Sequence, residues 1–352
     1  MKKEPLKRST MTLTGGSLLL LLVIVVIWAS AVGAVPVPFV QSARIVLAKL
    51  PFVNKEKLLR DIPDSSKLII WNIRLPRVLL AGLVGGGLAA AGVVMQALFR
   101  NPLADPYILG VSSGAGLGVA LYIMGTSLFG ASKSLILNSL GSAGAALAGA
   151  LLVTLLLLYV SGRVKGSLTL LIFGVMIGFI ASALVNLLQY ASNAHSLKAY
   201  VLWTMGSFAA LDGIQITVLC VLAFAGLALA VWNIKDLNAL LPGEEYASSV
   251  GLNVKRIRTR ILISTTLLSG AVTAFCGPIG FLGIAVPHIA RFIFKNADHR
   301  VLMPASALLG AVLTVFADTV AELPGTGSVI PINTVAALLG IPVIIAILFR
   351  KN

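Results

Sequence analysis

The sequence predicts an all-α, polytopic membrane protein with ten transmembrane helices and both termini in the cytoplasm. Three observations support this fold class. Hydrophobic residues make up 58% of the 352 residues and charged residues only 11%, which suits a bundle solvated by lipid. Long uncharged runs recur along the whole chain. Lysine and arginine gather in alternate loops, as they do in membrane proteins.

The uncharged runs give the spans in chain order. The first run follows Lys2, Lys3, Lys7 and Arg8, and its apolar core is longer than that of a signal peptide, so it is interpreted as a first span. The seventh run contains glycine, proline and glycine at 277, 278 and 280, and we therefore divide it into two spans. The runs cover residues 9–43, 78–99, 106–132, 134–162, 166–197, 213–234, 261–290, 301–317 and 323–349.

We interpret residues 1–352 as a single transmembrane domain with two notable loops. Residues 36–72 are predicted to be external, with a surface helix near 39–50, and residues 235–260 to be cytoplasmic. Most of the lysine and arginine assigned to the outside falls in the first of these loops, and long translocated loops constrain orientation weakly. The formal net charge of +15 thus comes mostly from lysine and arginine residues that flank the membrane spans, and it predicts no nucleic-acid partner. The glycines spaced four apart in several spans predict close helix packing.

A polar island at Gly243–Gly251 interrupts the apolar sequence. Its residues Gly243, Glu244, Glu245, Ala247 and Gly251 form a short amphipathic element that ends in glycine, which suits docking to a soluble partner. The basic residues from Lys255 to Arg260 would anchor it to anionic lipid. A solvated loop between two spans is the alternative interpretation.

Several functions lack the residues that they need. The sequence has no phosphate-binding loop and no clustered metal ligands, so we predict no catalytic residues, no metal and no cofactor. Cys220 and Cys276 are interpreted as buried apolar residues. A stand-alone secondary carrier, the alternative function, would need an ionisable group at mid-membrane, for which Asp318 is the best candidate. An integral-membrane enzyme would need clustered catalytic residues.

Four motifs occur in a fixed order. Their sequences are Arg-Leu-Pro-Arg at 74–77, Asn-Pro-Leu-Ala-Asp-Pro at 101–106, the Gly-Glu-Glu-Tyr-Ala element at 243–247, and Gly-Pro-Ile-Gly at 277–280 before Pro-His-Ile-Ala-Arg at 287–291. Together they resemble the permease family of bacterial ABC importers for iron–siderophores, haem and vitamin B12. The resemblance extends from about residue 73 to residue 349.

This resemblance implies a homodimer in the bacterial cytoplasmic membrane with its substrate path on the dimer axis. Two separate ATPase subunits would bind below, and a periplasmic or lipid-anchored binding protein above. The substrate would be an iron chelate, meaning a ferric siderophore or haem, or else cobalamin, and the iron chelates are favoured.

The resemblance also assigns roles to residues. Arg74 and Arg77 match external arginines that contact glutamates of a binding protein, although both could instead be membrane anchors. Asn101 and Leu103 match residues near the inner gate of the path, as does Ser167 less closely. The segment Gly243–Gly251 matches the helix that couples to the ATPase.

One position departs from the family pattern. Family members often carry a third docking arginine after the motif Ala-Asp-x-x-Ala, and here the motif at 317–321 is followed by Glu322. Glu322 is therefore predicted either to dock against a basic or neutral residue of the binding protein or to lie in a solvent-facing loop. The Pro-Gly-Thr-Gly sequence at 324–327 favours a turn there.

Overall fold

The structure is a computed structural model that describes residues 8–49, 51, 53–125, 135–164, 166–208, 211–322 and 330–349. The described chain is helical and contains no strand. The helices are α1 (Arg8–Ala31), α2 (Phe39–Leu47), α3 (Lys55–Leu59), α4 (Asp64–Ile69), α5 (Leu75–Phe99), α6 (Val111–Ala120), α8 (Leu135–Ser161), α9 (Ser167–Ala191), α10 (Ala194–Thr204), α11 (Gly213–Trp232), α12 (Ile234–Leu240), α13 (Glu244–Ser249), α14 (Val254–Thr265), α15 (Ala271–Cys276), α16 (Leu282–Phe294), α17 (His299–Ala321) and α18 (Ile332–Phe349). Short π-helical turns at Ile70–Arg74, Leu121–Gly125 and Thr266–Gly270 and a 3-10 turn at Pro106–Leu109 join some of them.

Seven of the described helical segments are long and apolar enough to cross a membrane. They are Thr10–Ala31, Asp64–Phe99, Gly141–Ser161, Ser167–Ala191, Gly213–Trp232, Val254–Cys276 and His299–Ala321. Three shorter apolar helices accompany them, at Val111–Gly125, Leu282–Phe294 and Ile332–Ala346. The prediction of an all-helical, polytopic membrane fold is therefore confirmed.

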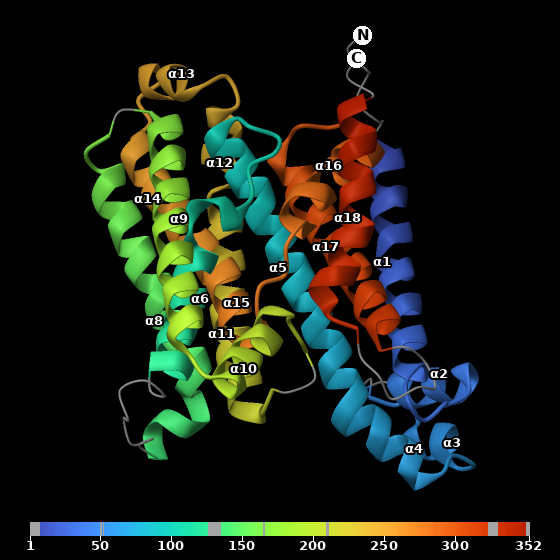
Figure 1. The fold of residues 1–352 in the computed structure, drawn as a ribbon. Coiled ribbons are helices and arrows are strands. Elements are labelled where there is room, and N and C mark those ends of the chain that lie inside the picture. Colours follow the sequence, from blue (N-terminus) through green and yellow to red (C-terminus); the bar gives the residue numbers. More distant parts are fainter. Residues whose placement is uncertain are drawn as a thin grey trace.

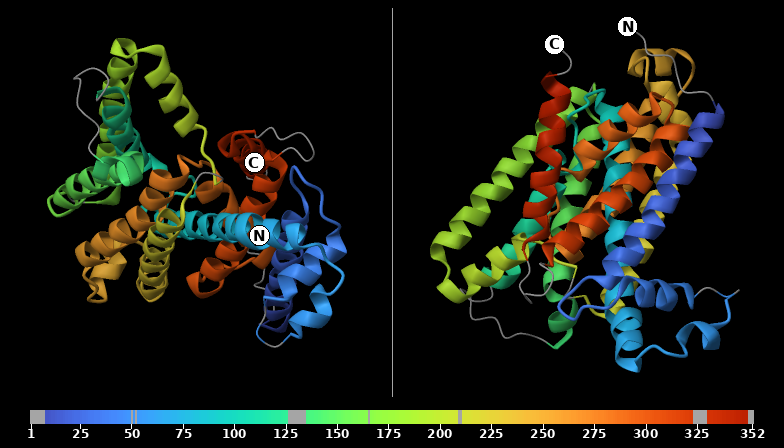
Figure 2. Two further views of the ribbon diagram at one scale, coloured as in Figure 1. Left: turned by 90° about the horizontal axis from the view of Figure 1, so that it is seen from below. Right: turned by 90° about the vertical axis from the view of Figure 1, so that its right-hand side faces the viewer.

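The bundle has two distinct ends (Figure 1). Helix α13 lies at one end, where α1 also begins and α18 finishes. Helices α2, α3 and α4 lie at the opposite end, beside the start of α5 (Figures 1 and 2). A helix is present near residues 39–50 as predicted: it is α2, which packs through Ile45 onto Ile62 and Ile70. Its location on the outer membrane surface stays a prediction. The segments 36–72 and 235–260 thus occupy opposite ends of one helical bundle.

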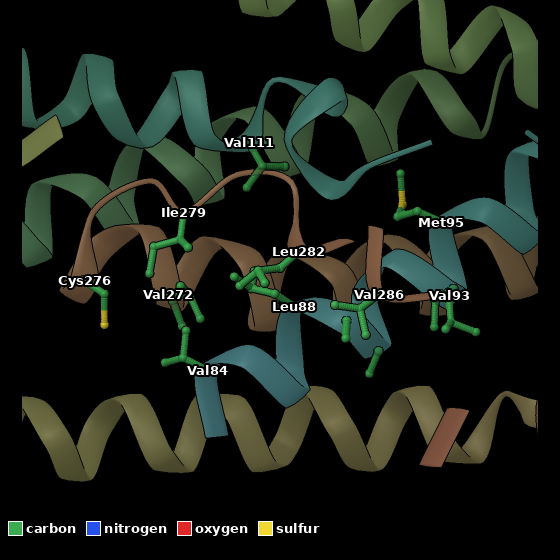
Figure 3. Packing of buried hydrophobic residues seen from close by; sticks show 14 of the residues in the cluster. Val84, Leu88, Val93, Met95, Val111, Val272, Cys276, Ile279, Leu282 and Val286 are labelled. Atoms are coloured by element: carbon green, nitrogen blue, oxygen red, sulfur yellow. The ribbon is translucent and has the colours of Figure 1, made fainter. Parts of the chain in front are cut away.

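Helix α5 runs through the middle of the bundle, and most of its residues are buried. Figure 3 shows Val84 and Leu88 of α5 among Val272 of α15 and Leu282 of α16. Glycines bring neighbouring backbones close: a Cβ on Gly85 would lie 2.3 Å from the carbonyl oxygen of Gly310 on α17. Because lipid gives apolar helices no hydrophobic reason to associate, such close backbone contact is what holds the bundle together.

The glycines predicted to allow close packing do so between α6 and α8. A Cβ on Gly118 would lie 2.1 Å from the carbonyl oxygen of Ala145, so any side chain there would force the helices apart. Gly114 meets Gly149 in the same way, since a Cβ on Gly114 would lie 2.7 Å from the carbonyl oxygen of Gly149.

The predicted break in the seventh uncharged run is confirmed. Helix α15 ends at Cys276 and α16 begins at Leu282, with Gly277 at φ 76° between them. Other elements supply hydrogen bonds to the backbone groups that lie between the two helices. Gly280 N donates to Asn333 Oδ1 at 3.0 Å, and Ser207 N donates to the Cys276 carbonyl at 2.9 Å. These partners satisfy backbone groups that the helices leave open inside an apolar bundle.

Candidate functional site

The predicted coupling element forms the short helix α13. Gly243 at φ 130° precedes it and Gly251 at φ 87° follows it, and such backbone angles favour glycine. Ala247 is fully buried, whereas Glu245, Tyr246 and the neighbouring serines are exposed. The helix therefore has one face seated on the bundle and one face directed away from it.

An ion pair fixes α13 to α14. Arg258 is buried, and its Nε donates to Glu244 Oε1 at 3.0 Å while its Nη2 donates to Glu244 Oε2. Such a two-point contact fixes orientation as well as distance. The prediction that the basic residues from Lys255 to Arg260 anchor the element to lipid was therefore wrong for Arg258. The periodicity of α14 turns this arginine inward, while Lys255 and Arg256 remain exposed.

A groove of about 610 Å³ lies beside α13, lined by the loop before α9 and by the start of α14. Its walls include Glu244, Glu245 and Gly166, and Arg258 Nη1 reaches the Val164 carbonyl at 3.5 Å. Ser167, predicted to lie near the inner gate, follows Gly166 directly and begins α9.

The other two predicted gate residues form one turn. The side-chain Oδ1 of Asn101 accepts from Leu103 N at 2.9 Å, and Leu103 is 39% exposed. The turn is at the α13 end, because a Cβ on Gly243 would lie 3.1 Å from the guanidinium of Arg100. Among the described residues no hydrogen bond joins this turn to Ser167, so the three share an end of the bundle but do not form one cluster.

Sequence reasoning passed over Asp105 in the same loop. Its Oδ1 accepts from Tyr107 N at 2.8 Å, but its Oδ2 is buried with no hydrogen-bond partner in the described part of the chain. Burial raises the pKa of Asp105 from 3.8 to about 6. The carboxyl thus has an unusual affinity for a proton beside the predicted gate.

At the opposite end, Arg74 is buried and bonded within the chain. Its guanidinium donates to the carbonyl oxygens of Ser30 and Ala31, both at 3.1 Å, and of Val35 at 2.5 Å. A Cβ on Gly33 would lie 2.6 Å from the same guanidinium. Arg74 therefore caps the carbonyl end of α1 and is 7% exposed.

Arg77 lies between two carboxylates of α17 and its C-terminal cap. Its Nε and Nη2 donate to the two oxygens of Asp318 at 3.0 and 2.7 Å, and its Nη1 contacts Glu322. Thus Glu322, at the position where the family often has arginine, compensates the charge of Arg77 in this chain. The predicted turn at 324–327 lies outside the described residues.

A polar cavity that the sequence analysis missed lies between α6, α9 and α10. Its volume is about 340 Å³, and serine, asparagine, glutamine, tyrosine and tryptophan side chains supply much of its lining. Ser182, Asn186 and Gln189 come from one face of α9, being four and three residues apart, and Tyr200 and Trp203 of α10 stack at 6.0 Å. This spacing in an otherwise apolar helix was the available sequence signal.

Comparison with known proteins identifies the family of this chain. Residues 20–350 match the FecCD transport family. The chain belongs to this family. The vitamin B12 import system permease protein BtuC of Salmonella typhi is 40% identical over 290 residues, covering 81% of this chain and 85% of that protein. BtuC of Salmonella paratyphi A is 39% identical over the same length and coverage.

A solved structure extends the likeness to the fold. It is an ABC transporter assigned to the metal-chelate type, in an inward-facing conformation, and it superposes with a TM-score of 0.78 at 28% identity. The match covers 97% of this chain and 99% of that one. This FecCD-family chain is therefore the membrane-embedded permease subunit of an ABC importer, a multi-pass protein of the bacterial inner membrane.

Within the part of this FecCD permease that the structure describes, no group of three or more potential metal-ligating residues occurs. His288 Nδ1 lies 2.8 Å from the Ile284 carbonyl, one turn back along α16. Cys220 and Cys276 are both free thiols. Cys276 is buried as predicted, whereas Cys220 is only half-buried, so the prediction of burial was wrong for Cys220.

Proposed function

We propose that this permease moves a bulky metal chelate, of the class that includes ferric siderophores, haem and cobalamin, through a path between two copies of the chain. The polar cavity carries this proposal. Its lining is rich in amides, hydroxyls and aromatic rings and contains no ionised side chain. Such a surface can form weak hydrogen bonds and stacking contacts with a large chelate without binding it tightly. Weak binding is needed in a transport path, because a tightly bound substrate would not be released.

The cavity also supports the proposed homodimer. Asn186 is exposed in the single chain although it lies within a predicted membrane span. An amide directed at lipid hydrocarbon would lose its hydrogen bonds, so such residues generally face water or protein. A second copy placed against α9 and α10 would enclose the cavity and shield Asn186 from lipid.

We further propose that the three shorter apolar helices complete ten spans. Helices α6, α16 and α18 would join the seven longer segments. Both termini would then be cytoplasmic, as would residues 235–260, because α1 begins and α18 ends at the same end of the bundle as α13 (Figure 1). Residues 36–72 would be external.

At the cytoplasmic end, α13 is proposed to receive an ATPase subunit, one for each permease copy. The relatives are permease proteins of an import system, and hydrolysis would belong to that separate subunit. Glu245 and Tyr246 offer the exposed contact face, and Gly243 and Gly251 let the chain enter and leave the short helix. Glu244 and Ala247 hold the helix on the bundle, and the predicted gate turn with Asn101 and Leu103 lies close by.

At the external end, a substrate-binding protein is proposed to dock near the start of α5. The docking roles of Arg74, Arg77 and Glu322 remain predictions. All three side chains already have partners within the chain, which limits how they could contact a binding protein. Arg74 would shape this end by capping α1. Arg77, Asp318 and Glu322 would present one cation with two carboxylates, which would favour a binding protein without a carboxylate opposite Glu322.

The stand-alone carrier has less support. Its best candidate for ion coupling, Asp318, accepts hydrogen bonds from two of the three guanidinium nitrogens of Arg77. A coupling carboxylate must gain and lose its ion during transport, whereas this one has a permanent cation beside it.

Uptake competition tests the substrate proposal. Cells that depend on this permease and its partners would take up radiolabelled cobalamin, a ferric siderophore or haem, each alone and with excess of the other two. We expect one metal chelate to accumulate and its uptake to resist competition by an excess of the other two. Accumulation of none of the three chelates would contradict the proposal.

A further inference from the structure

A second pocket, of about 280 Å³, lies at the α13 end between α5, α12, α16 and α17. It is separate from the groove beside α13 and from the polar cavity. Its lining contains two arginines and a histidine, together with Gln96 and apolar residues. The arginines are Arg100, which follows α5, and Arg291, near the end of α16.

Within the described part of the chain, the arginines of this pocket lack the carboxylate partners that Arg77 and Arg258 have. Arg77 and Arg258 each have carboxylate partners. Arg291 instead donates to the neutral amide oxygen of Gln96 at 2.6 Å, and among the described residues no carboxylate lies within ion-pair distance of Arg291 or Arg100. A guanidinium that has lost part of its water without gaining a counter-charge provides a site for an anion.

The remaining polar groups narrow the choice of ligand. His299 is 1% exposed, and its Nδ1 donates to Asn238 Oδ1 at 2.7 Å. Nε2 of the neutral ring is therefore an acceptor, which suits a hydroxyl of the ligand, such as a P–OH or a headgroup hydroxyl. The nearby carboxylate of Asp298 is already engaged by Asn238 Nδ2 at 2.7 Å and by Arg300 N at 2.8 Å. Both bonds go to Oδ1 of Asp298, which caps α17, and among the described residues no ion pair joins Asp298 to Arg100 or Arg291.

We propose that this pocket binds a phosphate-bearing anion, either the headgroup of an anionic phospholipid or a free phosphate, and that Arg100 links it to the coupling helix. Planar guanidinium groups match phosphate oxygens in pairs. Basic pockets between helices at the cytoplasmic surface are suited to lipid phosphates. Arg100 also lies against Gly243, where a Cβ would be 3.1 Å from its Nη1. A ligand that holds Arg100 would therefore affect the backbone at which α13 begins.

Binding can be measured on the purified full-length chain in a neutral detergent. One arm titrates dioctanoyl phosphatidylglycerol and follows its adducts by native mass spectrometry, with dioctanoylglycerol as the uncharged lipid. The other arm titrates inorganic phosphate by calorimetry. Arg291→Gln and Arg100→Gln are compared with Arg163→Gln, which removes the same charge from an arginine that stacks on Tyr159 outside the pocket.

We expect at least one phosphate probe to bind the wild type, and each pocket variant to weaken it by about tenfold or more. Arg163→Gln should change the affinity less than twofold. Saturation by phosphatidylglycerol alone would assign a lipid headgroup, and saturation by phosphate alone a soluble ligand. Arg100 is exposed, so Arg100→Gln remains informative if Arg291→Gln fails to fold.

Two results would overturn the site. One is the absence of binding in both arms. The other is an equal loss of affinity in all three variants, which would show attraction to general surface charge rather than to the pocket. Neither result depends on which chelate the permease transports. The proposal of an anion site and the proposal of a metal-chelate substrate can therefore be refuted independently of each other.

Discussion

The contact between Arg258 and Glu244 predicts how firmly the coupling helix is held. Replacing Arg258 with glutamine would leave the carboxylate of Glu244 without its cation. Removing one partner of a fully buried pair costs about 3–5 kcal/mol. The side chain of Glu244 is 22% exposed and that of Arg258 5%, so solvent screening reduces the expected cost to about 2 kcal/mol.

This loss would act on the docking of α13 more than on the whole fold. An energy of about 2 kcal/mol corresponds to a roughly 30-fold larger population in which α13 has separated from α14. Hydrogen–deuterium exchange should therefore quicken by about that factor at the amides of α13 while exchange in α5 stays the same. Uptake should fall if α13 couples to the ATPase as proposed, because the helix is then no longer fixed to α14.

The chain provides a matched control for this experiment. Arg260 on the same helix contacts Asp236 at 3.4 Å, and its side chain is 45% exposed, so Arg260→Gln should leave exchange in α13 nearly unchanged. The double variant Glu244→Gln, Arg258→Gln should recover part of the protection, since no unpaired charge is then left. Equal exchange in wild type and Arg258→Gln would refute this account of how α13 is held.

Three further predictions concern other buried polar groups. The pKa of Asp105 is raised above its unfolded value, so the folded protein gains stability as the pH falls from about 6 to about 4. Asp105→Asn should abolish this pH dependence. It should also raise the free energy of unfolding at pH 7 by about 3 kcal/mol, as measured by thermal unfolding. A pH-independent wild type would contradict this assignment. Arg77→Gln should destabilise by about 3–5 kcal/mol because it leaves Asp318 buried and unpaired, whereas Lys67→Gln, at an exposed pair, should cost about 1 kcal/mol or less. Asn186→Leu should preserve folding in detergent but reduce uptake, and undiminished uptake would remove this residue from the path.

The spans were predictable because each is a property of a contiguous segment. An uncharged run long enough to cross a bilayer needs no knowledge of its neighbours. Even the break between α15 and α16 was recognisable, since glycine and proline at 277 and 278 interrupt any regular helix. The polar face formed by Ser182, Asn186 and Gln189 could also have been found from its helical spacing.

The ion pairs could not be predicted in this way. Arg77 and Asp318 are separated by 241 positions in the chain, and their meeting depends on the packing of α5 against α17. The sequence motif suggested an arginine free for a partner protein, but it carries no information on which groups already compensate that charge. The inward direction of Arg258 likewise depends on how α14 is rotated within the bundle.

Site-specific cross-linking tests the central claim most directly. A photoreactive residue at Tyr246, on the exposed face of α13, would be compared with one at Lys57, on α3 at the opposite end, in cells that express the complete transporter. The account predicts that position 246 captures an ATPase subunit and that position 57 does not. Failure of position 246 to capture any ATPase, or capture of the ATPase from position 57, would contradict an importer permease driven through α13.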